Sequence, residues 1–234
     1  MQTHDLVIVG AGPVGMALAL ALKDSGLDIL LVDARPRGAA RQDPRVLALS
    51  HGTRLTLERL GVWAQLPATA IETIHISHQG GLGRTLLRAE EYGQPALGYV
   101  VPAGALAGAL DDALASAGIP ICDNAAVSGL AGGADDVIVS LADGRHLRTR
   151  LAACAEGAIQ GADDKPLVEH DYDQHAVICV ATPAEPHGGR AWERFTPQGP
   201  LAVLPCGSGC AIVHTAAPAE ADALLALDDA TYLA

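Results

Sequence analysis

The stretch DLVIV (residues 5–9) followed by GAGPVG (residues 10–15) decides the fold of this chain. The first five residues form a short and almost continuous apolar run, which is typical of a parallel strand covered on both faces. The glycines then follow the GxGxxG spacing, and a proline at the start of the next segment suits a first helical turn. We therefore predict a strand, a glycine-rich turn and a helix over residues 13–23.

A second apolar run over residues 28–32 ends at Asp33, 18 residues beyond the last glycine. Together these segments predict one βαβ unit that binds a dinucleotide. Gly10 would allow the tight turn, Gly12 would let a pyrophosphate approach the backbone, and Gly15 would let the helix pack on the strand. The predicted cofactor-binding residues of this unit are Gly10, Gly12, Pro13, Val14, Gly15, Asp33, Ala34 and Arg35.

The acid at the end of the second strand can accept hydrogen bonds from ribose hydroxyls. A carboxylate at Asp33 would repel a 2′-phosphate, so NADP is disfavoured at this site. The fingerprint by itself fits both NAD and FAD, and that choice stays open at this point.

Composition and charge narrow the class of protein. Half of the 234 residues are hydrophobic and 18% are charged, which predicts a globular chain. Lys and Arg number 15 against 27 Asp and Glu, so the net charge of −12 disfavours a nucleic-acid partner. Four arginines at positions 35, 37, 41 and 45 are crowded together, and both a local anion site and a solvated loop would explain them.

The cysteines and histidines predict neither disulfides nor a metal site. The five cysteines form no CxxC pair, which fits a reducing cytoplasm, and Cys206 and Cys210 bracket a glycine turn. His51, His75 and His78 have no recognisable partner in the sequence, so no catalytic acid or base is predicted. We expect no signal peptide and no membrane span, because the apolar runs are far shorter than about 18 residues.

The rest of the chain predicts further α/β structure and then mostly strands. Helices are expected over 52–60, from 102 to 117 and over 221–233, and a hairpin turn at Asp143-Gly144. Strands are expected at 71–78, 119–121, 137–141, 151–155, 176–182, 200–204 and 210–215. A mostly β region therefore follows residue 160.

Four segments beyond the glycine turn resemble the FAD-dependent aromatic hydroxylases (p-hydroxybenzoate-hydroxylase-like), and within them the ubiquinone-biosynthesis hydroxylases. These segments are DPRVLALS (43–50) with GVW (61–63), LGYVV (97–101), WERFTP (192–197), and GP (199–200) with LP (204–205). The resemblance implies FAD as cofactor, NAD(P)H as co-substrate, O₂ as oxidant and a prenylated phenol as substrate. It further implies that Arg45 contacts the flavin cofactor and that Gly199-Pro200 lies near the active-site face.

The resemblance also sets the expected domains. It predicts a Rossmann-like FAD-binding domain (1–70 and 97–160) interleaved with an incomplete, mostly β substrate domain (71–96 and 161–234). Glu156 and Gly157 stand where the family has an Asp-Gly motif for pyrophosphate and NAD(P)H, and Gln160 and Asp163 replace the Ser and Arg that usually follow. We expect about the last third of a family member, including its Gly-Asp segment for FAD, to be missing.

Three functions remain open on the sequence alone. The first is a flavin-dependent monooxygenase of ubiquinone biosynthesis, cytoplasmic or peripheral at the inner membrane face, with contact to a biosynthetic complex left open. The second is an NAD-dependent oxidoreductase with the same βαβ start. The third is a truncated or degenerate flavin-binding fragment without activity, which the altered Glu156 region favours.

Overall fold

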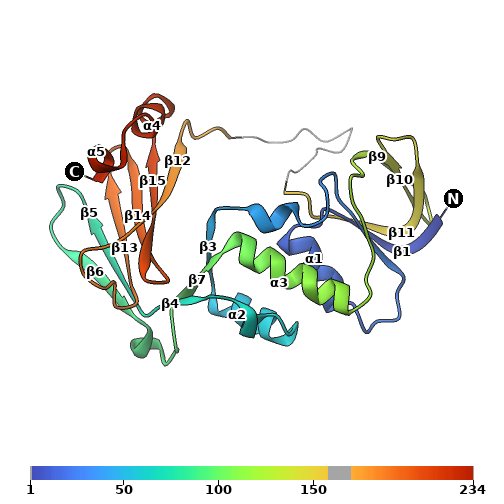
Figure 1. Cartoon of the computed structure of the whole chain (residues 1–234), viewed down its shortest axis with the longest axis horizontal. Helices are drawn as coiled ribbons and strands as arrows, with labels where there is room; N and C mark the ends of the chain where they lie inside the picture. The colour runs from blue at the N-terminus through green and yellow to red at the C-terminus, as the bar shows by residue number, and fades with distance from the viewer. Residues whose placement is uncertain (1, 158–169, 234) are drawn as a thin grey trace. The chain divides into compact units, whose positions relative to one another are not determined.

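The computed structural model describes residues 2–157 and 170–233, and within them the chain forms two compact units. The first unit takes residues 2–44, 55–66 and 102–157, and the second takes 45–54, 67–101 and 170–233. Figure 1 shows the elements of both. Residues 45–54, 67–70 and 97–101 belong to the second unit, whereas the sequence placed them in the FAD-binding domain. The function of each unit stays a prediction.

The first unit is built on a six-stranded sheet with the order β8-β2-β1-β11-β10-β9. Neighbours from β8 to β11 run parallel, and β10 and β9 add an antiparallel meander. The strands are β1 (Gln2–Val9), β2 (Ile29–Val32), β8 (Ile121–Cys122), β9 (Val127–Gly132), β10 (Val137–Leu141) and β11 (His146–Cys154). The structure thus confirms the predicted α/β class and its parallel βαβ start.

Two helices cover this sheet. α1 (Pro13–Ala21) connects β1 to β2, and it packs against α3 (Ala103–Ser116), which precedes β8. The buried core carries the apolar runs that the sequence marked, with Ile8 and Leu31 at 0% exposure. α1 is two residues shorter than predicted, because the Leu22 N–H bonds to the Ala19 carbonyl and tightens the last turn.

The second unit contains two sheets. The larger has the order β12-β15-β14-β13-β5-β6 and is antiparallel except where β13 pairs with β5; the smaller has the order β3-β7-β4. Its strands are β3 (Val46–Leu49), β4 (Thr69–Ile71), β5 (Thr73–His78), β6 (Arg84–Arg88), β7 (Gly98–Pro102), β12 (His175–Ala181), β13 (Arg190–Thr196), β14 (Gly199–Cys206) and β15 (Gly209–Ala216). The predicted mostly β character of this region is present.

The remaining helices are short. They are α2 (His51–Arg59), η1 (Ala39–Gln42), η2 (Trp63–Gln65), η3 (Ala89–Tyr92), α4 (Pro218–Leu225) and α5 (Asp229–Leu233). The single helix predicted over 221–233 is wrong: a break separates α4 from α5, where the Asp228 carboxylate accepts the Thr231 N–H and caps a new helix. None of the helices in the described ranges is long and apolar enough to cross a bilayer.

Candidate functional site

Four parallel strands of the first unit end at the same edge of its sheet. Val9 pairs with both Val32 and Cys154, and Val32 pairs with Cys122. The segments that follow these four residues therefore lie side by side. We call these segments the carboxyl edge: 10–12 after β1, 33–35 after β2, 123 after β8 and 155–157 after β11. Ligands of open parallel sheets bind at such an edge.

The glycine-rich turn is in close backbone contact at Gly10 and Gly15 and is open at Gly12. Gly10 adopts φ +106°, and a Cβ placed on it would lie 2.6 Å from the carbonyl oxygen of Ala155. A Cβ on Gly15 would lie 2.0 Å from the carbonyl oxygen of Gly10. A Cβ on Gly12, in contrast, would have no neighbour within 4 Å. Two glycines thus allow the turn to pack, and the third leaves its outer side accessible.

The open side of the turn is the beginning of α1. Gly12 is the N-cap, Pro13 occupies the first turn, and the first bond within the helix runs from the Met16 N–H to the Gly12 carbonyl. The N–H groups of Val14 and Gly15 come before Met16 in the chain and so have no acceptor within the helix. Val14 is 72% exposed. Such a helix start, with its dipole, attracts an anionic group such as a phosphate.

Asp33 connects the end of β2 to the glycine-rich turn. Its Oδ2 accepts the Ala11 N–H at 2.7 Å, and its Oδ1 accepts the backbone N–H and the Nε–H of Arg35 at 2.8 and 3.1 Å. Burial raises the pKa of Asp33, but the bonds from Arg35 and Ala11 outweigh burial and hold that pKa below its ordinary value. Asp33 is therefore an ionised acid fixed beside the turn.

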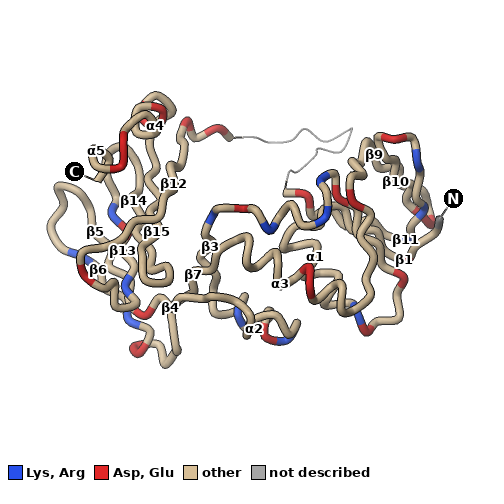
Figure 2. The backbone as a smooth tube through the Cα atoms, viewed as in Figure 1, with Lys and Arg blue, Asp and Glu red and all other residues tan. Residues whose placement is uncertain are grey.

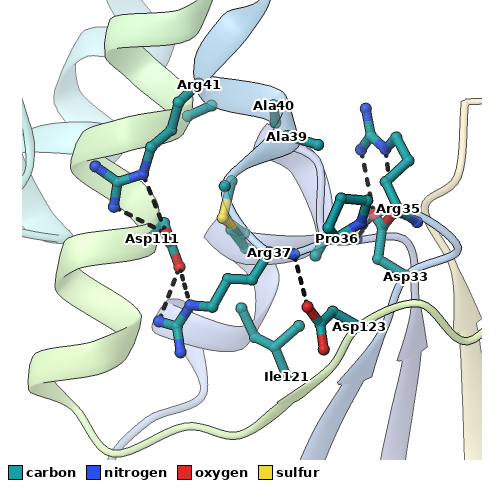
Figure 3. Close-up of a pocket in the computed structure, with 14 residues that line it drawn as sticks. Asp33, Arg35, Pro36, Arg37, Ala39, Ala40, Arg41, Asp111, Ile121 and Asp123 are labelled. Carbon is teal, nitrogen blue, oxygen red and sulfur yellow. Dashed lines mark hydrogen bonds and ion pairs between the residues drawn. The ribbon is translucent and has the colours of Figure 1, made fainter.

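A small pocket opens between Asp33 and α3. The sequence had marked the arginines of its lining but not their acidic partners, Asp111 and Asp123. Figure 3 shows Arg37 and Arg41 pointing toward Asp111, and the backbone of Arg37 bonded to Asp123. Figure 2 shows basic residues, with an acidic residue among them, along the segment that leads into β3. Three of the four arginines form ion pairs with a buried carboxylate: Arg35 pairs with Asp33, and Arg37 and Arg41 pair with Asp111.

The remaining predicted residues of the first unit also lie at the carboxyl edge. Ala34 is exposed next to Asp33, and Glu156 and Gly157 are exposed in the bend after β11. The Cα of Glu156 would be 2.8 Å from a Cβ on Gly10, so this bend packs against the glycine-rich turn. Gln160 and Asp163 lie outside the described residues.

Arg45 and Gly199-Pro200 belong to the second unit. Arg45 is exposed and immediately precedes β3, while Gly199 and Pro200 begin β14. Their contacts with a cofactor stay predictions. Sequence resemblance is the only signal for either role.

None of the three noted histidines forms a catalytic pair with an acid among the described residues. The ring of His51 lies 6.4 Å from that of Tyr99, and its buried Nδ1 has no hydrogen-bond partner among them. His78 stacks on Phe195 at 5.8 Å, and His75 lies on β5. In the described ranges, no group of three His, Cys, Asp or Glu could hold a metal ion.

The first unit fits the ADP half of a dinucleotide on three observations. The open side at Gly12 is a cradle that a Cβ would fill, the start of α1 offers N–H groups to a pyrophosphate, and Asp33 stands where ribose hydroxyls need an acceptor. The pocket has a volume of only about 20 Å³, so most of an adenosine would lie outside it.

Comparisons with known proteins agree with this geometry. A family model described as an FAD binding domain matches residues 3–159. Ubiquinone hydroxylase UbiL of Rhodospirillum rubrum is 29% identical over 235 residues, which cover 97% of this chain and 55% of the relative. Ubiquinone biosynthesis monooxygenase COQ6 of Xenopus tropicalis is 26% identical over 261 residues, covering 98% and 55%.

Solved structures show the same fold. The crystal structure of p-nitrophenol 4-monooxygenase PnpA from Pseudomonas putida superimposes with a TM-score of 0.76 at 19% identity, covering 99% of this chain and 60% of that one. At this identity the likeness concerns the fold. The chain spans about half the length of the curated relatives that it matches.

Proposed function

Because the chain belongs to the FAD binding domain family, we propose that its first unit holds the ADP half of FAD in a flavin-dependent monooxygenase. The proposed reaction is hydroxylation of the aromatic ring of a prenylated phenol in ubiquinone biosynthesis, with NAD(P)H and O₂ as co-substrates. The names of the relatives support this substrate class. One observation supports the choice of cofactor most directly: Asp33 is hydrogen-bonded to the glycine-rich turn at the carboxyl edge, directly beside an open helix start.

Each residue of the carboxyl edge has a defined task in this proposal. The N–H groups of Val14 and Gly15 would bind the pyrophosphate, since the helix start leaves them outside the helical ladder. The Asp33 carboxylate would accept a ribose hydroxyl in place of the exposed Arg35 guanidinium, whose Nε and Nη2 occupy two of its four acceptor positions in this structure. Bound FAD would supply the redox chemistry, taking a hydride from NAD(P)H and activating O₂ for transfer to the ring.

The same carboxylate sets nucleotide preference. Asp33 is 9% exposed and its pKa lies below the ordinary value, so it carries a full negative charge at neutral pH. A 2′-phosphate placed next to it would be repelled. We therefore expect this site to reject NADP, and we expect NAD(P)H, as co-substrate, to bind elsewhere.

The second unit would contribute to the apolar part of the substrate site. Its strand β12 exposes Ile178 and Val180 at 43% and 63% of their surface, and Phe195 of β13 is 42% exposed. Exposed apolar side chains of this kind suit a prenylated ring. Peripheral contact with a membrane face, which such a substrate would favour, stays a prediction.

An NAD-dependent oxidoreductase is the competing function, and ligand binding separates the two. The purified full chain is titrated with FAD, FMN, NAD and NADP by calorimetry, and its visible absorption is recorded. We expect FAD to bind with flavin absorption that is lost on denaturation, FMN to fail, NADP not to displace bound FAD, and NAD to bind more weakly than FAD. Tight NAD binding by a chain that does not bind FAD would overturn the proposal.

A further inference from the structure

Two arginines between β2 and β3 converge on one carboxylate of α3. The Nε and Nη2 of Arg37 lie 2.9 Å from Oδ1 of Asp111. The Nη2 and Nε of Arg41 lie 2.8 and 3.2 Å from its Oδ2. Each arginine thus takes one oxygen of the same acid, as Figure 3 shows.

The carboxylate of Asp111 is buried, whereas the two arginines that pair with it are partly exposed. The Asp111 side chain is 9% exposed, whereas those of Arg37 and Arg41 are 44% and 37% exposed. A buried carboxylate must be paired, and its removal leaves the guanidinium groups without their partner. Asp112 also pairs with Arg41, at 2.5 Å, but its side chain is 64% exposed and solvent screens that pair.

The surface of α3 is shaped to receive Arg41. Gly104, Gly108, Asp111 and Asp112 stand at i, i+4, i+7 and i+8, which places them on one helix face. A Cβ on Gly104 would lie 2.3 Å from the carbonyl oxygen of Arg41, and a Cβ on Gly108 would lie 3.4 Å from its Nη1. We call these four residues the α3 socket. Its glycines let the backbone of Arg41 approach α3 closely, and its two acids pair with the Arg41 guanidinium.

The segment held by this socket begins at the proposed ribose acid. Arg35 bonds to Asp33 through both its backbone and its guanidinium, and the Arg37 N–H bonds to Asp123 at 2.8 Å. Residues 34–41 are therefore fixed at the carboxyl edge on one side and at α3 on the other. Residues 35–41 of this segment line the pocket together with Met16 and Asp33.

We infer that Asp111 is a positioning residue for the cofactor: it holds residues 34–41 in the conformation that leaves the Asp33 side of the cradle ready for the adenosine. This inference rests on the proposed function, because it assumes that the first unit binds the ADP half of FAD. Asp111 would not touch the ligand. It would act by keeping the binding-competent conformation populated, and an affinity falls in proportion to the fraction that is lost.

The test compares Asp111→Asn with wild type in the full chain by two measurements. Trypsin cleavage after Arg37 and Arg41, followed by mass spectrometry without ligand, reports whether the segment is held. Calorimetric titration with ADP alone reports the cradle. We expect Asp111→Asn to be cleaved faster at both arginines and to bind ADP about ten-fold more weakly, as a fall of the competent population to about a tenth requires.

Three further variants make the result decisive. Asp143→Asn removes the acid of another ion pair of the same unit, the exposed pair with Arg145, and should match wild type in both measurements. Asp111→Glu keeps the charge and should recover part of the ADP affinity. If Asp111→Asn does not fold, Arg37→Gln leaves Arg41 paired and should show faster cleavage after Arg41 and weaker ADP binding, both changes smaller than in Asp111→Asn. The cleavage site at residue 37 is itself removed in this variant.

The outcomes separate this inference from the proposed function. Unchanged cleavage in Asp111→Asn overturns the inference, and so does faster cleavage with unchanged ADP affinity, since Asp111 would then be structural only. A wild-type chain that binds no ADP overturns the proposed function and, with it, the cofactor role of Asp111. Faster cleavage together with weaker ADP binding supports both.

Discussion

The Oδ2 atom of Asp33 lies 2.7 Å from the backbone nitrogen of Ala11, so the acid that ends β2 holds the glycine-rich turn that follows β1. This bond joins the two parts of the βαβ fingerprint. Arg35 donates to both oxygens of the same carboxylate, with its backbone N–H and Nε to Oδ1 and with its Nη2 to Oδ2. The acid is therefore a structural tie as well as a candidate ribose acceptor.

Asp33→Asn should destabilise the chain at neutral pH by about 1.5–3 kcal/mol, the usual contribution of hydrogen bonds to a charged group. The folded state lowers the pKa of Asp33 below its ordinary 3.8, so this stabilisation is full above that pH and is lost as the pH falls through the folded pKa. Urea unfolding at pH 7 and at pH 3 checks this. A difference between variant and wild type that is no smaller at pH 3 than at pH 7 would contradict it.

Gly15→Ala should destabilise the chain by about 2 kcal/mol, although alanine favours a helix. The reason is the 2.0 Å approach of the new Cβ to the carbonyl oxygen of Gly10, which the turn cannot relieve by moving a flexible side chain. Thermal and urea unfolding give the measurement. Unfolding at the wild-type midpoint would show that α1 is not held as the structure has it.

Gly104→Ala and Gly108→Ala form a matched pair on α3. The first should destabilise by about 1–3 kcal/mol, because its Cβ would lie 2.3 Å from the Arg41 carbonyl oxygen. The second should stay within about 1 kcal/mol of wild type, since its nearest atom, at 3.4 Å, is the end of the flexible Arg41 side chain. Equal midpoints for the two variants in urea unfolding would contradict the α3 socket.

Glu193→Gln should raise the melting temperature at pH 7. Glu193 of β13 is flanked by Ile76 of β5 and Ala202 of β14, and burial raises its pKa above the ordinary 4.5. The folded state then favours the protonated acid below pH 4.5 and loses that advantage as the pH rises through the folded pKa. The gain should therefore vanish in calorimetry at pH 4.

The control for this prediction is the exposed Glu185. Glu185→Gln makes the same chemical change without burial and should leave the melting temperature unaltered at both pH values. If the melting temperature rose equally in the two variants at pH 7, the cause would be net charge and not the burial of Glu193, because each variant removes one negative charge from a chain of net charge −12.

The βαβ start could be predicted because its signals are local. The apolar run that ends at Val9, the glycine spacing and Asp33 each act on their immediate neighbours, and the structure places them where the sequence did. The break between α4 and α5 was missed although its signal is also local. Asp228 could have been recognised as an N-cap, but the apolar residues on both sides suggested one continuous helix.

The α3 socket was harder to predict because its partners are 70 and 74 residues apart in the sequence. The arginines between β2 and β3 pointed equally to an anion site or a solvated loop. A sequence signal does exist: Asp111 interrupts the buried face of α3, between Leu110 and Leu114, and an acid in such a place needs a cation. Which cation reaches it depends on the tertiary fold.

The central claim, that the first unit holds the ADP half of FAD, is tested most directly by FAD titration of Gly12→Ala beside wild type. Gly12 has φ −83° and ψ 179°, which alanine adopts freely, and its Cβ would have no neighbour within 4 Å. The N-cap change should therefore cost no more than about 1 kcal/mol in stability.

The new methyl group would stand where the pyrophosphate approaches, so FAD affinity should fall about ten- to hundred-fold, as the loss of one charge-assisted hydrogen bond requires. Wild type that binds FAD, with Gly12→Ala equally well folded but impaired in binding by this amount, is the result we predict. A wild-type chain that does not bind FAD, or a Gly12→Ala variant that binds it as tightly as wild type, would contradict the account.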